Sequence, residues 1–343
     1  MNPSKKLGLY WLSREQKLLL KASALEGKDA LDAWEKWKES VDIENLDSGS
    51  NTLLCQLYRN LSAHGVEDFH MARLKGIFKR NWYANQLLVK KLETILQAFA
   101  SSDIPVMLLG DVAFIAGYEG DYLCHPLYQI NLLVHTASGQ KVLELLTQLG
   151  WNQINNSKSI LTEQNLLIQL QDKFGTRLQL QGHIFWALPQ DYTEKQLWAN
   201  AIPTQIGDTK TLILSPTDLF LHLCMRTFYR NTNVQINLLA DAMIILKAGE
   251  KDFNWIELLS QAQRYRVILP LRNMLNLLQE LFEISIPQWV LPALHQAPVS
   301  DRELMKYRIL VTRKKTFLKS ILLRIVYFLK AKRRIFDYKL KLS

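Results

Sequence analysis

Apolar residues recur at helical spacing through residues 13–98, a stretch rich in leucine, alanine, lysine and glutamate. The pattern is clearest from Leu53 to Leu61 and from Phe78 to Phe99. Apolar side chains that recur three and four positions apart lie on one face of a helix. We therefore predict a helical N-terminal region that ends before Ser101.

The hydrophobic pattern changes at Pro105, where a short apolar run, Ile104–Leu109, predicts a strand. Gly110 follows this run and is expected to open a helix. A second apolar run over residues 128–135 predicts another strand.

An amphipathic pattern over residues 138–149 predicts a helix that ends at Gly150. Residues 165–171 and 176–182 both alternate between apolar and polar positions. The four residues between them, 172–175, have the length of a hairpin connection. A strand, a helix, a strand, a helix and a hairpin together predict a small mixed sheet.

Helical patterns return after Ser215, which precedes Pro216 in an order typical of a helix start. Further helical runs lie near residues 235–248, 254–265 and 267–283. The fold class that we predict is α+β. Its expected parts are a helical region over 1–99, a mixed α/β core over 100–213, a second helical region over 214–300 and a basic amphipathic tail over 301–343.

Two amide side chains, Gln129 and Asn131, lie two positions apart in the second predicted strand. Residues at this spacing project from the same face of a strand. Amides can offer oxygen ligands, but they lack the negative charge that draws Mg²⁺ out of its water shell. Taken alone, this alternation also fits two polar residues on a solvent-facing strand.

Several short motifs on predicted strands and helices resemble those of the uncharacterised bacterial nucleotidyltransferases, a family with the polymerase-β-like fold. The resemblance covers roughly residues 70–290. Its motifs lie at Leu108, Leu109 and Gly110, at His125 to Val134, at Gln181 to Ile184 with Trp186 nearby, at Leu214, Pro216, Asp218, Phe220, His222 and Leu223, and at Asp241, Phe253 and Trp255.

The resemblance also implies that the charged residues of the family site are replaced in this chain. The signature lysine falls on Leu109, the two metal-binding aspartates on Gln129 and Asn131, and the third carboxylate on Gln181. Two-metal phosphoryl transfer needs anionic ligands, and their loss costs several kcal/mol of transition-state stabilisation. We therefore expect a catalytically impaired pseudo-nucleotidyltransferase, a binding or accessory protein in polysaccharide or natural-product assembly.

No residue is assigned a confident catalytic or metal-binding role, and no cofactor is expected. Asp111 follows Gly110 at a predicted helix start, where its carboxylate would compete with a phosphate for the backbone N–H groups. The candidates for ligand binding are Gly110, Asp111, Gln129, Asn131, Gln181 and His183.

Three alternatives remain open. The first is an active transferase that uses relocated carboxylates such as Asp111 or Asp121, and it alone would need Mg²⁺ and a nucleoside triphosphate. In the second, His183, His222 and Asp241 serve only structural roles. The third is a membrane-surface adaptor.

The net charge of +10 is concentrated at the C-terminal end. Residues 301–343 hold 14 lysines and arginines against 3 acidic residues, so the first 300 residues carry a net charge of −1. Basic and apolar positions are interspersed over residues 314–336, which predicts a basic amphipathic helix. Its apolar stretch is shorter than the ~20 residues that span a bilayer. Docking on an anionic membrane surface and docking on protein are both open for this segment.

The remaining features bear on compartment and partners. Cys55, Cys124 and Cys224 are far apart, which predicts buried thiols rather than a disulfide or a zinc site. The N-terminus predicts no secretory signal, so we expect a cytoplasmic protein, with a peripheral position at the inner membrane face as a variant. A partner enzyme or a small-molecule ligand is the expected partner of the cleft, and nucleic acid is disfavoured because no reading module is recognisable.

Overall fold

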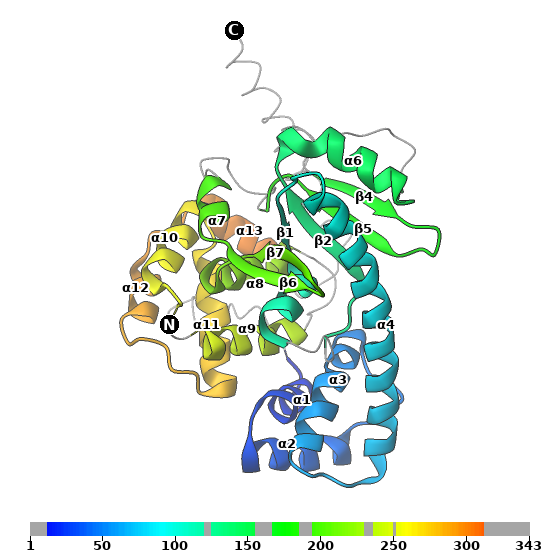
Figure 1. Cartoon of the computed structure of the whole chain (residues 1–343). Coiled ribbons are helices and arrows are strands. Elements are labelled where there is room, and N and C mark those ends of the chain that lie inside the picture. Colours follow the sequence, from blue (N-terminus) through cyan, green and yellow to red (C-terminus); the bar gives the residue numbers. More distant parts are fainter. Residues whose placement is uncertain are drawn as a thin grey trace.

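The structure is a computed structural model that describes residues 12–119, 125–154, 167–184, 194–229, 236–249 and 252–311. Its first part is helical, as the sequence predicts. Side chains of Ser13, Asp47 and Asp68 cap three of these helices, each accepting a bond from a backbone N–H of the first turn. The four helices are α1 (Arg14–Ala24), α2 (Gly27–Ser40), α3 (Ser48–Ala63) and α4 (Phe69–Ala100) (Figure 1).

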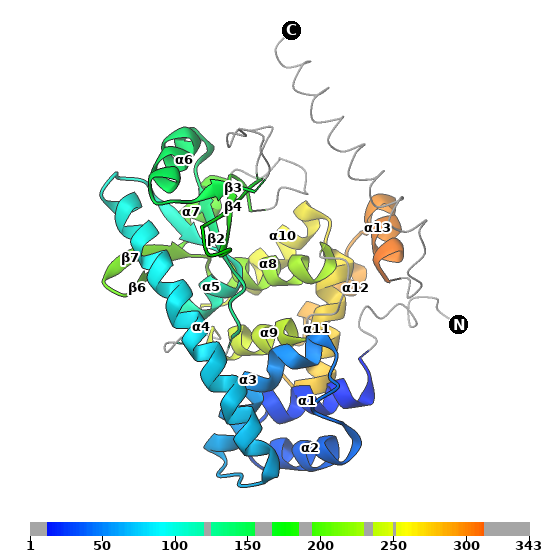
Figure 2. The same ribbon diagram turned by 90° about the vertical axis from the view of Figure 1, so that its right-hand side faces the viewer.

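Helix α4 connects the N-terminal helices to the sheet (Figures 1 and 2). Its 32 residues make it about 48 Å long. Its first half packs on α3, and its second half contacts β2, β6, β7 and α6. One helix therefore supports both regions of the chain.

Seven strands form one mixed sheet in the order β3-β4-β5-β2-β1-β7-β6. Strand β2 lies in the middle, antiparallel to β1 and parallel to β5. The sheet and the α-helices that cover it confirm the predicted α+β class. The strands are β1 (Val106–Leu108), β2 (Gln129–Val134), β3 (Asn152–Gln153), β4 (Leu167–Gln171), β5 (Arg177–Gln181), β6 (Ile202–Ile206) and β7 (Thr209–Ile213).

The two faces of β2 meet different parts of the hydrophobic core. Ile130, Leu132 and Val134 pack in a cluster that includes side chains of α4 and of α6 (Gly139–Gln148). Leu133 belongs to a second cluster, together with side chains of the C-terminal helices. Because side chains alternate along a strand, Gln129 and Asn131 share the face of Leu133. They therefore face toward the C-terminal helices.

The C-terminal helices begin where the sequence predicts. The Ser215 hydroxyl accepts a bond from the Asp218 N–H and donates one to the Asp218 carboxylate, which fixes the first turn of α8. No described helix is both long and apolar enough to cross a membrane. The helices are α7 (Glu194–Ala199), α8 (Pro216–Tyr229), α9 (Asn237–Ala248), α10 (Trp255–Tyr265), α11 (Ile268–Phe282), α12 (Val290–Gln296) and α13 (Asp301–Val311).

The sheet is larger than the sequence pattern predicts. The pattern leaves out the β6–β7 hairpin, which adds two strands beside β1. The hairpin turns at Gly207, whose φ of 55° suits glycine. The predicted β4–β5 hairpin is present, with Asp172 N–H donating to the Thr176 carbonyl.

Other predictions fall partly outside the described residues. Cys55 and Cys224 are buried and form no disulfide, as expected, whereas Cys124 lies outside the described residues. The basic segment 314–336 also lies outside them, and the division into four parts stays a prediction.

Candidate functional site

Three amide side chains of β2 and β5 lie together on the sheet face that turns toward the C-terminal helices. Gln129 Nε2 donates to Asn131 Oδ1 at 2.7 Å and to Gln179 Oε1 at 3.4 Å. Asn131 is only 5% exposed. We call Gln129, Asn131 and Gln179 the amide cluster. Its members satisfy one another, so two of its three amide oxygens already accept a hydrogen bond.

The strand register places Gln179 rather than Gln181 beside the β2 amides. Asn131 pairs with Gln179, whereas Gln181 pairs with Leu133, two residues further along both strands. Gln181 is buried on the same face, and His183 lies just beyond the end of β5, partly buried. Gln181, the position that the resemblance gives to the third carboxylate, therefore lies two residues beyond the strand partner of Asn131.

Gly110 links the amide cluster to the helices. It opens α5 (Gly110–Phe114) with a φ of 64°, a conformation that L side chains rarely adopt. A Cβ atom there would lie 3.1 Å from Asn131 Nδ2 and 3.3 Å from Arg226 Nη1. Asn131 and the Arg226 guanidinium therefore approach the same backbone position, and only glycine leaves them room.

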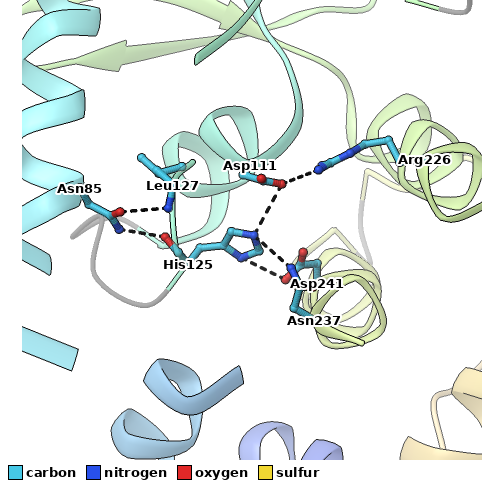
Figure 3. Close-up of polar contacts among 7 residues, drawn as sticks. All are labelled: Asn85, Asp111, His125, Leu127, Arg226, Asn237 and Asp241. Carbon is cyan, nitrogen blue, oxygen red and sulfur yellow. Dashed lines mark hydrogen bonds and ion pairs between the residues drawn. The ribbon is translucent and has the colours of Figure 1, made fainter. Parts of the chain in front are cut away.

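Four side chains, Asp111, His125, Arg226 and Asp241, form an ion cluster (Figure 3). Arg226 Nη2 donates to Asp111 Oδ1 at 2.7 Å. His125 lies between two carboxylates, with Nε2 3.6 Å from Asp111 Oδ1 and Nδ1 3.4 Å from Asp241 Oδ1. The cluster joins α5, the segment before β2, α8 and α9.

Each carboxylate in the ion cluster faces a cation. Burial by itself lowers the pKa of His125, but the carboxylates of Asp241 and Asp111 outweigh burial and raise this pKa well above 6.5. Burial by itself raises the pKa of Asp111, but the Arg226 guanidinium and the His125 ring hold it well below its ordinary value. Burial raises the pKa of Asp241, and His125 offsets part of that effect. With His125 charged, the four groups are balanced two against two.

Asn85 holds the segment of His125 from the N-terminal side (Figure 3). Asn85 on α4 donates to the His125 carbonyl at 2.8 Å and accepts from the Leu127 N–H at 3.0 Å. On the other side, Asp241 of α9 pairs with the His125 ring, and Asn237 Nδ2 lies 3.3 Å from His125 Nε2. The segment that enters β2 is thereby tied to α4 on one side and to α9 on the other.

Residues 50–283, more than half of the chain, match a family described as uncharacterised nucleotidyltransferase. The chain belongs to this family. The match confirms the family resemblance that the motifs at Gly110 and β2 predict.

Several solved structures are similar to this chain at low sequence identity. One is an antigenic nucleotidyltransferase-like protein from Paracoccidioides brasiliensis, 14% identical, with a TM-score of 0.38, over 62% of this chain and 94% of that chain. Another is the antibiotic-resistance factor ANT(2'')-Ia, 14% identical, with a TM-score of 0.37, over 53% of this chain and 94% of that one. A search of curated proteins finds no match.

The donor groups of this nucleotidyltransferase-family chain do not suit the divalent metal that the fold implies. Mg²⁺ is held in proteins by carboxylates, and the amide cluster offers only neutral oxygens, two of which already accept hydrogen bonds. In the ion cluster both ring nitrogens of His125 face carboxylates, which leaves no imidazole lone pair for a metal. Among the described residues, no group of three or more His, Cys, Asp or Glu side chains is placed to hold a metal ion.

The structure also revises the expected role of Asp111. Its carboxylate accepts a hydrogen bond from Arg226 on α8 rather than from a backbone N–H group that opens α5. Asp241 pairs with His125, which lies on the loop before β2, so its carboxylate joins α9 to this loop. Asp121, the other relocated carboxylate, lies outside the described residues.

Sequence reasoning missed Arg226, Gln179 and Asn85. Gln179 lies two residues before Gln181 on an alternating strand, so its shared face was readable from the sequence. Arg226 and Asn85 carry no local signal, because their partners Asp111 and His125 are 115 and 40 residues away.

Proposed function

We propose that this nucleotidyltransferase-family protein does not transfer nucleotides and instead serves as a binding or accessory protein. The observation that supports this proposal is the amide cluster: Gln129 and Asn131 are hydrogen-bonded to each other at 2.7 Å on the strand where the family resemblance puts two metal-binding aspartates. The setting that this resemblance implies is polysaccharide or natural-product assembly.

The expected energetic consequence is large. A divalent ion and a triphosphate must both exchange their hydration for protein ligands, and neutral amides repay little of that cost. Removing one charged partner of a phosphoryl-transfer transition state typically costs several kcal/mol, or a factor of about a thousand in rate. Replacing both carboxylates on β2 is therefore expected to reduce transfer to background.

A relocated carboxylate is the competing explanation, and the geometry of Asp111 counts against it. Asp111 would have to leave Arg226, to which it is bonded at 2.7 Å with only 16% of its side chain exposed. Separating a buried ion pair costs about 3–5 kcal/mol. The same contact supports a structural role for Asp111 in joining α5 to α8.

Calorimetric titration and product analysis with ATP, CTP, GTP and UTP test the proposal. The full-length protein is titrated in Mg²⁺ and again in EDTA, and each mixture is then analysed for released pyrophosphate and for nucleotidylated product. The proposal predicts no transfer product with any of the four, and no binding that depends on Mg²⁺.

Tight Mg²⁺-dependent binding together with product formation would overturn the proposal. In that case Asp121→Asn identifies a relocated carboxylate by abolishing turnover. Asp111→Asn is less informative, because it also leaves Arg226 without its carboxylate partner.

A further inference from the structure

Helix α4 is strongly basic, although the first 300 residues together carry a net charge of −1. It has six lysines and arginines but a single acidic residue, Glu93, and so a net charge of +5. Three of its cations have acidic partners: Arg73 pairs with Glu44, Lys90 with Glu93, and Lys91 with Asp172. The other three, Lys75, Lys79 and Arg80, are exposed and take part in none of the ion pairs seen among the described residues.

These cations continue into an exposed apolar stretch along one ridge of the helix. Lys75, Lys79, Tyr83, Leu87 and Lys91 follow one another at intervals of four residues, which places them along one row on the helix surface. Tyr83 is 62% and Leu87 53% exposed. The row extends over about 24 Å.

The ridge ends at the tip of the β4–β5 hairpin. Phe174 at this tip is 75% exposed, and its ring centre lies 5.0 Å from Lys91 Nζ and 5.1 Å from Lys173 Nζ. Lys91 also donates to Asp172 at 2.5 Å, which ties the hairpin tip to α4. An apolar ring flanked by two cations therefore extends the same surface.

We propose that this basic ridge, Lys75, Lys79, Arg80, Tyr83, Leu87 and Lys91 together with Lys173 and Phe174, docks on an anionic lipid bilayer. Lysine and arginine bind anionic headgroups, each adding up to about 1 kcal/mol near the surface. Aromatic and leucine side chains between them enter the headgroup boundary. The ridge has both kinds of group in one line.

The shape and charge of the ridge favour a membrane over other occupants. A second copy would bring another +5 helix against this one, which like-charge repulsion opposes. Single-stranded nucleic acid is bound in positively charged grooves, whereas the ridge consists mostly of exposed residues of α4, a helix that lies along the edge of the molecule (Figures 1 and 2). The β4–β5 hairpin projects past α4 on this same side in Figure 1.

This inference does not depend on the loss of nucleotidyl transfer, and it concerns a different surface from residues 314–336. The test must therefore measure whether the side chains of the ridge themselves contact lipid. Hydroxyl-radical footprinting with mass spectrometry does so on the full-length protein, because it reports the solvent access of single side chains.

Footprinting is carried out with vesicles containing 30% phosphatidylglycerol in phosphatidylcholine, and with vesicles of phosphatidylcholine alone. We expect the oxidation rates of Tyr83 and Phe174 to fall at least about fivefold on the anionic vesicles only. Ile256 and Trp289, exposed apolar residues outside the ridge, serve as controls and keep their rates.

Three results would overturn the inference: no vesicle binding, vesicle binding without protection of Tyr83 and Phe174, or equal protection on neutral vesicles. A third arm of the experiment replaces the vesicles with a single-stranded oligonucleotide. Protection in that arm alone would assign the ridge to nucleic acid instead.

A charge variant of the full chain gives a second, independent readout. Lys75→Gln/Lys79→Gln/Arg80→Gln is expected to weaken binding to anionic vesicles between about 10- and 100-fold. All three positions are exposed, so folding should be retained, and circular dichroism checks this. An affinity equal to that of the control variant contradicts the inference. The control neutralises three exposed lysines elsewhere, Lys28, Lys36 and Lys195.

Discussion

The amide cluster and the ion cluster both lie beside Gly110 and are largely shielded from solvent, but their polar groups are satisfied in different ways. In the amide cluster, Gln129 donates to the oxygens of Asn131 and Gln179, and no formal charge is present. In the ion cluster, two carboxylates face an arginine and a histidine within 3.6 Å. A neutral set and a balanced set both avoid an unpaired buried charge.

This difference separates the role of each cluster. The sheet face that the resemblance assigns to metal has no negative charge, and the negative charges that remain nearby are balanced by Arg226 and His125. The remaining charges connect elements that are far apart in sequence, since α5, α8 and α9 all contribute. The comparison therefore predicts that changes to the ion cluster affect stability strongly, and that changes to the amide cluster chiefly affect what the site can bind.

The largest effect is expected from Arg226→Met. It leaves the Asp111 carboxylate, 16% exposed, without its guanidinium partner, and should lower the free energy of unfolding by about 3–5 kcal/mol in urea denaturation. The matched control is Arg73→Met, which breaks the surface pair with Glu44 and should cost less than about 1 kcal/mol. Equal losses in the two variants would remove the distinction between the ion cluster and an ordinary surface pair.

A pH series on His125→Asn is expected to show the next effect. A histidine with a raised pKa in the folded state contributes stability that is complete below pH 6.5 and is lost as the pH rises through the raised value. Wild-type unfolding free energy should therefore fall above pH 6.5, while that of His125→Asn stays flatter. The exposed-histidine control, His135→Asn, should keep the wild-type slope, and a wild-type slope in His125→Asn would contradict the assignment.

Asp111 is expected to determine how the unfolding free energy changes at acidic pH. Because its pKa is lowered in the folded state, Asp111 contributes stability that is complete above pH 3.8, its ordinary pKa, and is lost as the pH falls below that value. The contributions of Asp111 and His125 should therefore both be complete between pH 3.8 and 6.5, whereas the raised pKa of Asp241 makes its own contribution decline as the pH rises above 3.8. Arg226→Met should flatten the acid side of the profile.

The smallest effect is expected from Gly110→Ala, which tests the point where the two clusters meet. The alanine would have to adopt the positive φ of this position, and its Cβ would lie close to Asn131 Nδ2 and Arg226 Nη1. We therefore expect the free energy of unfolding to fall by about 1–2 kcal/mol in thermal or urea unfolding. Gly76→Ala, at an exposed position of α4 with nothing near its Cβ, should instead stabilise by about 0.5–1 kcal/mol. A neutral result at Gly110 would mean that Asn131 and Arg226 are not constrained there.

Local patterns were enough to predict much of the fold. The predicted helical starts at Ser215 and Gly110 and the β4–β5 hairpin are all present, because caps, glycines and alternation act over a few residues. The β6–β7 hairpin was missed although Gly207 and Asp208 divide two alternating runs. This turn signal could have been recognised from the sequence alone.

The site was only partly predictable. The shared face of Gln129 and Asn131 follows from strand periodicity, and the structure bears it out. The pairing of His125 with Asp241 and of Asp111 with Arg226 depends on how α8 and α9 pack against the sheet. Such pairs join positions more than 100 residues apart, and local patterns in a single sequence do not show which distant side chains are in contact.

The most direct test of the central claim is a titration of the wild-type protein with Mn²⁺, followed by electron paramagnetic resonance of the free ion, with and without ATP. The account predicts that the free-ion signal in the presence of protein matches that of buffer, or of ATP alone, up to ~1 mM, because neutral amides do not collect the metal. Gln129→Asp/Asn131→Asp provides the comparison and should remove Mn²⁺ from solution. Uptake of two Mn²⁺ ions per wild-type chain at micromolar concentration would contradict the account.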